Sequence, residues 1–346
     1  MNVVVQIQEN VSLAQHSTMA LGGPARYMTD VYKRDDVAEA ARWAHEHGDV
    51  AIIMIGHGSN IVWSDAGFNG LVIVNQIVGY ESYEEDNENT YLTIGGGEVW
   101  DSVVERSVQT GLTGIEALSL IPGTAGATPV QNVGAYGQEI AQTLVTVEAY
   151  DRHKGDFTTI AASDCNFAYR TSRFKTTDRG RYFITALTLH LMKGNPLPPF
   201  YASVQTYLEQ HNITAPTPID IRQAVIAIRT AKLPNPAIVH NCGSFFSNPI
   251  VSEEEYEELA ETYSSVPHWP AGDSGVKLSA AWLIEQTGFK GIHDAETGIA
   301  TWPQQPLVLV NEHAKNTAGL LAFKQKVVTA VQGKFRITLE QEPELF

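Results

Sequence analysis

Apolar positions along the chain follow two periods, and each period predicts one kind of element. Spacings of three and four residues predict helices at 36–48, 99–110, 219–230, 253–264, 280–287 and 318–332. Apolar runs of strand length predict strands at 50–55, 71–74, 91–94, 143–150, 182–191, 307–310 and 335–339. The first half is rich in strands and poor in helices, so the pattern predicts an α+β fold.

Polar and small residues separate these runs. We expect the acidic stretch 81–88 to be an exposed turn, and 151–155 to turn one strand back as a hairpin. The stretch 193–200, KGNPLPPF, is the strongest boundary signal in the chain. A chain of 346 residues is expected to form two or three domains.

The composition limits the kinds of ligand and partner that the protein is expected to bind. The net charge is −16 and no basic block compensates for it, which argues against a general nucleic-acid or membrane-surface binder. An anionic ligand would have to be met by a few placed cations. Charged residues make up 18% and apolar residues 43% of the chain, which is typical of a globular protein with an ample core.

The sequence gives no support for a secreted, a membrane-spanning or a metal-binding protein. The N-terminal stretch MNVVVQIQENVSLAQHS has no basic leader followed by an apolar core, and runs such as 307–310 are too short to span a bilayer. Cys165 and Cys242 stand far apart without metal-like spacing, and the histidines are scattered. We therefore expect a cytoplasmic protein with two reduced thiols and no metal.

Three small-residue segments point to a large ligand. Residues 121–139 read IPGTAGATPVQNVGAYGQE, residues 56–60 read GHGSN, and 95–97 are three glycines. Loops of this kind let backbone amides approach a pyrophosphate, although an ordinary packed loop is the simpler alternative for each one alone. Neither G-x-G-x-x-G nor a phosphate loop ending in G-K-[ST] is present. Together the segments favour an extended ligand, and a flavin dinucleotide has the right size.

Three clusters of polar residues could carry chemistry. Tyr169 and Arg170 lie side by side and could hold a carboxylate, although a surface salt bridge is the simpler interpretation. Ser244 follows a glycine and precedes two phenylalanines, but it lacks the G-x-S-x-G elbow and a histidine to activate it. A proton donor, an oxyanion partner or a simple cap are the roles left open for it. The C-terminal acids in 340–344 could be solvated or could bring one carboxylate to a cleft.

Six motifs occur in one order along the chain: G-x-G-S-N, IPG-x-x-G-x-x-P-x-QN-x-GAYG-x-E, YR-x-S-x-FK, R-T-x-KLP-x-P, N-x-GSFF-x-NP and VKL-x-A-x-WLI. Together they resemble the UDP-N-acetylenolpyruvoylglucosamine reductase family of peptidoglycan synthesis. The resemblance covers nearly the whole chain, from about Ser17 to the end. It is closest to the family's first type, which carries a tyrosine loop.

This resemblance implies a fold and an activity. The fold would be a vanillyl-alcohol-oxidase-type FAD-binding fold of two small α/β subdomains plus a C-terminal α/β substrate-binding domain. The subdomains would be 1–75 (joined by 335–346) and 76–194, followed by a linker and tyrosine loop at 195–218 and the substrate domain at 219–334. The activity would be NADPH-dependent reduction of UDP-N-acetylenolpyruvoylglucosamine to UDP-N-acetylmuramate through FAD, by a cytoplasmic monomer.

The resemblance also assigns residues by their place in the motifs. The residues implied to hold FAD are Gly56, Gly58, Ser59, Asn60, Gly123, Thr124, Gly126, Asn132, Gly134 and Ala135. The residues implied to bind substrate are Tyr169, Tyr201, Lys232, Asn248, Trp269 and Lys277. Trp269 stands where many members have a tyrosine, and it can stack but cannot donate a phenolic hydrogen bond. The segment 301–303, Thr-Trp-Pro, departs from a more usual Val-His pair.

The implied chemistry uses three residues. Arg170 stabilises the enolate that hydride transfer creates, a C-terminal glutamate assists, and Ser244 protonates the neighbouring carbon. The tail reads LEQEPELF, where the family usually has L-E-P-E-V. Alignment without gaps selects Glu342 and alignment of the Pro-Glu pair selects Glu344, and we favour Glu342.

Two competing functions stay open at this point. The chain could be another FAD-dependent oxidoreductase of the same fold, or a non-catalytic relative that binds a UDP-sugar. The joint presence of the arginine, the serine and a terminal acid argues against the second.

Overall fold

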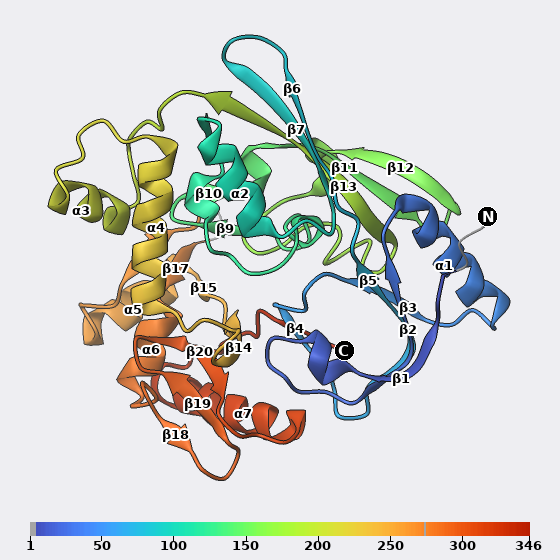
Figure 1. The fold of residues 1–346 in the computed structure, drawn as a ribbon. Coiled ribbons are helices and arrows are strands. Elements are labelled where there is room, and N and C mark those ends of the chain that lie inside the picture. Colours follow the sequence, from blue (N-terminus) through green and yellow to red (C-terminus); the bar gives the residue numbers. More distant parts are fainter. Residues whose placement is uncertain (1–4, 273–274) are drawn as a thin grey trace. The chain divides into compact units, whose positions relative to one another are not determined.

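The computed structural model describes residues 5–272 and 275–346; the first four residues of the expected first subdomain lie outside this range. The chain forms two compact units, shown in Figure 1. The first unit comprises residues 1–11, 25–57 and 68–230, and the second comprises residues 12–24, 58–67 and 231–346. No helix in the described part is long and apolar enough to cross a membrane. The expected division into three parts stays a prediction.

A small sheet opens the first unit. Its strands β1 (Gln8–Ser12), β2 (Pro24–Val31), β5 (Phe68–Asn75) and β3 (Ile52–Ile55) lie in that order, with β2 and β3 parallel to β5. Helix α1 (Arg34–Glu46) connects β2 to β3 and buries Val37 and Ala40 against Val31, Leu71 and Ile73. The crossover through α1 lets β2 and β3 run in the same direction, with β5 between them.

A larger antiparallel sheet follows. The strand order is β12 (Asp156–Ala161), β11 (Leu144–Asp151), β13 (Tyr182–Lys193), β7 (Asn89–Gly95) and β6 (Tyr80–Glu84), and the short β8 (Leu112–Thr113) also pairs with β13. Helix α2 (Trp100–Gln109) buries Trp100, Val103 and Val104 in the same core as Leu187 and Leu189 of β13. The expected hairpin is confirmed, because Asp151 of β11 pairs with Asp156 of β12.

The expected turn at 81–88 is wrong in part. Residues 80–84 form β6, which pairs with β7 and extends from the sheet as a long ribbon in Figure 1. This strand lies at the edge of its sheet and four of its five residues are exposed, so acidic side chains occur where an apolar alternation would mark a buried strand.

Two further helices complete the first unit. They are α3 (Ala202–Gln210) and α4 (Pro218–Lys232), which pack together through Val204, Leu208, Ile221, Ala224 and Val225. The pattern of apolar positions did not predict α3, which lies inside the stretch expected to be a linker. Short elements complete the list for this unit: β9 (Gly134–Ala135), β10 (Gln138–Glu139), η2 (Glu116–Leu118), η3 (Ala125–Ala127), η4 (Ile140–Gln142) and η5 (Ala162–Cys165).

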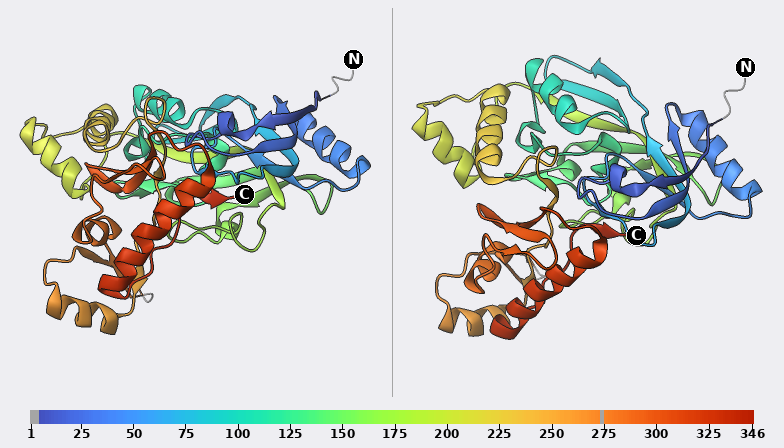
Figure 2. Two further views of the ribbon diagram at one scale, coloured as in Figure 1. Left: turned by 90° about the horizontal axis from the view of Figure 1, so that it is seen from below. Right: turned by 60° about the horizontal axis from the view of Figure 1, so that its bottom comes forward.

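The second unit combines two larger sheets and one two-stranded sheet with three α-helices in its described part. One sheet has the order β14 (His240–Ser244), β20 (Gln305–Asn311), β19 (Ile299–Trp302) and β18 (His293–Asp294). The other has the order β15 (Ile250–Val251), β17 (Val276–Leu278) and β16 (His268–Pro270). The helices are α5 (Glu253–Thr262), α6 (Ala280–Gln286) and α7 (Thr317–Phe335). The long α7, red in both views of Figure 2, contacts β19. The turn η1 (Leu13–His16) also belongs here.

The expected strand at 335–339 is wrong. Phe335 is the last residue of α7, and Arg336 ends the helix in the left-handed conformation with φ 60°. The apolar stripe Leu320, Phe323, Val327, Val331 and Phe335 continues the helix to that point, because all five side chains are buried in one core. The tail instead forms β21 (Glu344–Leu345), which pairs in parallel with β4 (Ile61–Val62).

Candidate active site

Gly56, Gly96 and the loop at 121–139, one part from each small-residue segment, meet inside the first unit. A Cβ atom at Gly56 would overlap Thr124 Oγ1, and a Cβ at Gly126 would lie 2.9 Å from the carbonyl oxygen of Gly96. Side chains at these positions would push the segments apart. The glycines at 56, 96 and 126 therefore allow the strand end after β3 and the loop at 121–139 to approach closely.

Two buried backbone amides near the start of this loop lack hydrogen-bond partners among the described residues. Gly123 and Thr124 are buried, yet their N–H groups, and that of Gly56, donate no hydrogen bond to any group in residues 5–272 and 275–346. Buried N–H groups are nearly always paired, so these donors fit an anionic ligand such as a pyrophosphate. The amide of Gly126 is different, since it donates to Gly96 O at 2.8 Å. Gly126 therefore contributes close packing rather than a free donor.

The QN-x-GAYG motif forms the tight β9–β10 hairpin. Its Asn132 is buried and its side chain is fully used: Nδ2 donates to Glu139 Oε2 at 2.8 Å and to Ala168 O at 3.2 Å, and Oδ1 accepts from Ala141 N at 3.2 Å. These bonds join the hairpin containing Gly134 and Ala135 to the segment that precedes Tyr169. The structure thus brings together two motifs that lie more than 30 residues apart.

Arg170 lies at the tip of a turn against that hairpin. Ala168 and Thr171 exchange two backbone hydrogen bonds of 3.2 Å, which leaves Tyr169 and Arg170 as the two tip residues. Arg170 has φ 53°, a conformation that costs a non-glycine residue about 1 kcal/mol. Its Nη2 donates to Gly134 O at 2.7 Å, and its guanidinium lies 5.2 Å from the centre of the Tyr169 ring.

Tyr201 lies beside a cavity in the same unit. It precedes α3, is 48% exposed, and contacts the ring of Tyr136 edge-on at 5.6 Å. The cavity measures about 270 Å³. Its lining includes Glu116, Gln138 and Phe200 beside the two tyrosines. The predicted tyrosine loop therefore lies against the GAYG segment.

In the second unit, Ser244 ends a strand that contains a bulge. Asn241 pairs with Val310 and Ser244 pairs with Val308, so β14 has one residue more than β20 between these pairs. Gly243 provides the left-handed conformation of the bulge with φ 75°. The buried Asn241 holds it, because its Oδ1 accepts from Gly243 N at 2.9 Å and its Nδ2 donates to Val239 O at 2.7 Å.

The two candidate glutamates lie beside different segments of that unit. Glu342 N donates to Phe245 O at 3.0 Å, next to Ser244. Burial and the nearby negative charge of Glu342 raise the pKa of the Cys242 thiol to about 12, which keeps this cysteine neutral. Glu344 lies instead beside the predicted cofactor residues of this unit, and its N donates to Asn60 O at 3.1 Å.

The remaining cofactor residues Gly58, Ser59 and Asn60 precede β4. Gly58 has φ 64°, and a Cβ there would overlap the carbonyl oxygen of His16. Its own carbonyl accepts from Thr18 N at 3.2 Å. Gly58 is therefore held closely against the turn η1 within the second unit.

Three predicted substrate residues gather on the small sheet of the second unit. Lys277 of β17 pairs with Trp269 on one side and with Ile250 on the other, so their side chains share one face. Trp269 is 40% exposed there. Asn248 lies just before β15, and its Oδ1 accepts from Ala280 N at 3.0 Å. Lys232 is exposed at the end of α4 and lies away from this cluster in sequence.

Comparisons with known proteins decide the family. Residues 28–161 match the model of an FAD binding domain, and residues 235–346 match that of the C-terminal domain of UDP-N-acetylenolpyruvoylglucosamine reductase. The reductase of Pseudomonas syringae pv. syringae (strain B728a) is 37% identical over 342 residues, 99% of each chain. That of Xylella fastidiosa (strain M12) is 39% identical over 341 residues, 98% of this chain and 95% of its own.

The chain belongs to the UDP-N-acetylenolpyruvoylglucosamine reductase family.

A solved structure agrees with this at the level of fold. The reductase from Thermus caldophilus superimposes with a TM-score of 0.67 at 21% identity, covering 99% of both chains. The resemblance inferred from the six motifs is confirmed, and so is the α+β class with an FAD-binding fold. Among the described residues no group of three or more His, Cys, Asp or Glu side chains could hold a metal ion.

Sequence reasoning missed several residues that shape this reductase-family site. Asn241 left a usable signal, because an Asn two residues before a Gly is typical of a side chain that bonds a following amide. Arg181 left none, because its partner Asp151 lies 30 residues earlier in the chain. Arg173 and Asp178 were missed as well, although they pair with each other only five residues apart.

Proposed function

We propose that the protein reduces UDP-N-acetylenolpyruvoylglucosamine to UDP-N-acetylmuramate in the synthesis of peptidoglycan precursors. The observation that carries this proposal is full-length identity of 37–39% to reductases of that name. FAD, when bound, supplies to the enol ether a hydride taken from NADPH. The chain's own residues must then hold the cofactor, orient the substrate, stabilise negative charge and deliver one proton.

The small-residue loops are suited to the cofactor. The partnerless amides of Gly56, Gly123 and Thr124 can donate to the pyrophosphate of FAD without any lysine. The other positions that we assign to the cofactor are Gly58, Ser59, Asn60, Gly126, Asn132, Gly134 and Ala135. Because Asn132 already uses its side chain within the protein, we assign its contact to the backbone.

Arg170 is the group that we assign to charge stabilisation. Hydride addition leaves an enolate beside the substrate carboxylate, and a fixed guanidinium stabilises that charge best when it is already oriented. The bond from Nη2 to Gly134 O and the constrained turn give Arg170 a defined direction before substrate arrives.

Ser244 is our candidate for the proton donor, and Glu342 for the assisting carboxylate. A serine hydroxyl is a weak acid, so it can protonate only a strongly basic carbon in a site that excludes water. The bulge held by Asn241 fixes the backbone at Ser244. We favour Glu342 over Glu344 because its backbone bonds to Phe245, the residue that follows Ser244, whereas Glu344 bonds to Asn60.

Six residues are assigned to substrate binding. Trp269 can stack on the uracil ring while Lys277, on the same face of its sheet, meets the diphosphate. Asn248 and Lys232 supply further polar contacts in this proposal. Tyr169 and Tyr201 contact the sugar-phosphate part, Tyr201 from the cavity edge.

The compartment and assembly state follow as part of this proposal. Both cysteines are buried and unpaired, which suits the reducing cytoplasm that also supplies NADPH. We place the protein there as a monomer. Size-exclusion chromatography with light scattering would refute the second statement if it gave twice the chain mass of 37.9 kDa.

An anaerobic absorption experiment tests the function directly. The purified protein should show a flavin spectrum that NADPH bleaches and that UDP-N-acetylenolpyruvoylglucosamine restores. Bleaching without restoration by the sugar would favour a different FAD-dependent oxidoreductase. Binding of the sugar without bleaching by NADPH or NADH would favour a non-catalytic relative.

A further inference from the structure

The loop that carries Arg170 has an unusual support at its base. It runs from the end of η5 at Cys165 to the start of β13 at Tyr182. Its tip residue Arg170 lies in the left-handed region, and such a conformation persists only where surrounding structure holds it. The bonds that hold this loop therefore decide where the Arg170 guanidinium lies.

Arg173 closes the base of the loop with three hydrogen bonds. Its backbone N donates to Cys165 O at 2.8 Å, and Nη1 donates to Asp164 O at 2.9 Å. Its Nε donates to the carboxylate of Asp178 at 2.7 Å. One side chain thus joins the segment before the turn to the segment after it. Its guanidinium also faces the Tyr182 ring at 5.4 Å.

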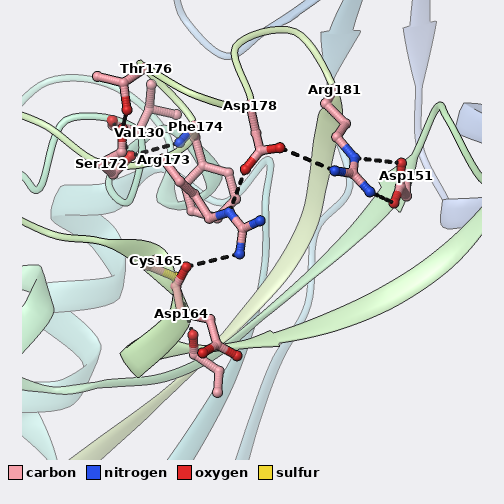
Figure 3. Close-up of polar contacts among 11 residues, drawn as sticks. Val130, Asp151, Asp164, Cys165, Ser172, Arg173, Phe174, Thr176, Asp178 and Arg181 are labelled. Atoms are coloured by element: carbon pink, nitrogen blue, oxygen red, sulfur yellow. Dashed lines mark hydrogen bonds and ion pairs between the residues drawn. The ribbon is translucent and has the colours of Figure 1, made fainter.

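A row of ion pairs continues from Asp178 to the large antiparallel sheet. Figure 3 shows Asp178 between two arginines, with Arg181 on the far side. Arg181 binds Asp151 through two bonds, Nε to Oδ1 at 3.0 Å and Nη2 to Oδ2 at 2.7 Å. Asp151 is the buried last residue of β11, and Arg181 directly precedes Tyr182, the first residue of β13. The row of ion pairs therefore ends on two paired strands. Bidentate pairs of this kind fix direction as well as distance.

A second anchor fixes the other side of the same turn. Ser172 is buried, and its Oγ donates to Val130 O at 2.6 Å and accepts from Phe174 N at 3.1 Å. Val130 belongs to the loop that also contains Gly134, the residue whose carbonyl accepts from Arg170. The turn is therefore held between the small-residue loop and the row of ion pairs.

We propose that Arg173 is a positioning residue that acts through Arg170, with Asp178, Arg181 and Asp151 as its anchor on the sheet. This inference rests on the role of Arg170 in the proposed function. We call the bonds from Arg173 to Asp164 and Asp178 the clamp. Of the residues assigned to the site, only Tyr169 and Arg170 lie between Asp164 and Asp178. Loss of the clamp should therefore move those two residues and leave the cofactor loops as they are.

The test compares Arg173→Met with Arg179→Met, which removes the same charge from an exposed position on the same loop. FAD content and the rate of flavin reduction by NADPH should stay unchanged in both variants. Reoxidation of the reduced protein by the enolpyruvyl sugar should slow about 30-fold in Arg173→Met and less than about twofold in Arg179→Met, because small displacements of a reacting group are costly. Arg173→Lys, which keeps the charge beside Asp178, should recover part of the loss.

A double-variant cycle separates positioning from general support. In an Arg170→Met background, Arg173→Met should slow reoxidation by no more than about twofold, because its effect passes through the missing side chain. If the two losses multiply instead, or if Arg173→Met slows both half-reactions equally, the inference is wrong.

Should Arg173→Met fail to fold, Asp178→Asn tests the same clamp, with a loss of about fivefold expected for reoxidation alone. A wild-type protein that the sugar does not reoxidise would refute the proposed function itself.

Discussion

The two reacting regions that we propose are held in place by different forces. The Arg170 turn in the first unit is anchored by alternating charges, Arg173, Asp178, Arg181 and Asp151, around an unusual backbone conformation. The Ser244 segment in the second unit is anchored by a backbone bulge and one buried amide, Asn241, in an apolar surrounding. Both regions use buried neutral hydrogen bonds, since Ser172 and Asn132 also hold the Arg170 turn, but the Arg170 turn adds the row of charges.

Because of this difference, we expect different changes to disrupt the two regions. Ion pairs respond to pH and to the removal of one partner, which leaves the other charge unpaired. A bulge held by one buried amide responds instead to the loss of that donor and acceptor. The following variants, ordered from the largest expected effect to the smallest, test whether the two regions are separate in this way.

Replacement of the proposed proton donor should have the largest effect. Ser244→Ala should slow the reoxidation of reduced flavin by the sugar about 10³-fold, within the range for loss of a general acid. Flavin reduction by NADPH should stay close to wild type, as measured by anaerobic stopped-flow absorption. Ser247→Ala, three residues along the same segment, is the control and should change neither rate. Equal slowing of both half-reactions in Ser244→Ala would contradict the role of proton donor.

The two tail glutamates should behave differently. Glu342→Gln should slow reoxidation about 10²-fold, the size expected for loss of one group that stabilises developing charge. Glu344→Gln should stay within about threefold of wild type, because its backbone bonds beside Asn60 rather than beside Phe245. Steady-state turnover of both purified variants settles the choice. Equal losses would show that the tail has been assigned wrongly.

Loss of the buried amide should have a smaller effect on rate. Asn241→Ala leaves Gly243 N without its acceptor, which should lower the free energy of unfolding by about 1–3 kcal/mol. The bulge should relax and slow reoxidation about 10-fold. Asn311→Ala is a matched control, because Asn311 is also buried and bonds Met19 O and Ala314 N. It should lose similar stability in urea unfolding and keep the wild-type reoxidation rate; the same slowing in both would rule out a specific role for Asn241.

The smallest expected effect is a change in how the stability of the protein depends on pH, and it concerns the first unit alone. The hydrogen bonds from Arg181, partly offset by burial, lower the pKa of the Asp151 carboxyl from 3.8 to about 2. A lowered folded-state pKa means that the ionised carboxylate stabilises the protein above pH 3.8 and that this contribution disappears as pH falls towards 2.

Asp151→Asn should therefore be less stable than wild type at neutral pH, and the two should converge between pH 3.8 and 2 in thermal unfolding. Asp156→Asn, at an exposed position that pairs with Asp151 across the hairpin, is the control and should follow the wild-type curve. A constant difference between Asp151→Asn and wild type across that range would show that the carboxylate charge does not matter.

The sequence predicted central elements better than peripheral ones. Strand β13 and helix α4 lie within two residues of their expected ends, because both bury regular apolar faces. The edge strand β6 and the tail strand β21 were missed, since an exposed edge carries charges and a two-residue strand has no period. Helix α3 was missed because the prolines before it indicated a linker.

The site followed the same rule. Motif residues could be named from the sequence, and the structure then brings Arg170 against Gly134 and Glu342 against Phe245. The supports of those residues could not be named. A partner such as Asp151 is distant in sequence and has no periodic signal, and the bulge at Gly243 depends on the register with β20.

The central claim is that Arg170 serves the transfer to the sugar and not the uptake of hydride from NADPH. The most direct test is the rate at which the flavin absorption of NADPH-reduced protein returns when the enolpyruvyl sugar is added to Arg170→Met. We expect reduction by NADPH at the wild-type rate and a return slowed by at least about 10²-fold. A return at the wild-type rate would contradict the claim.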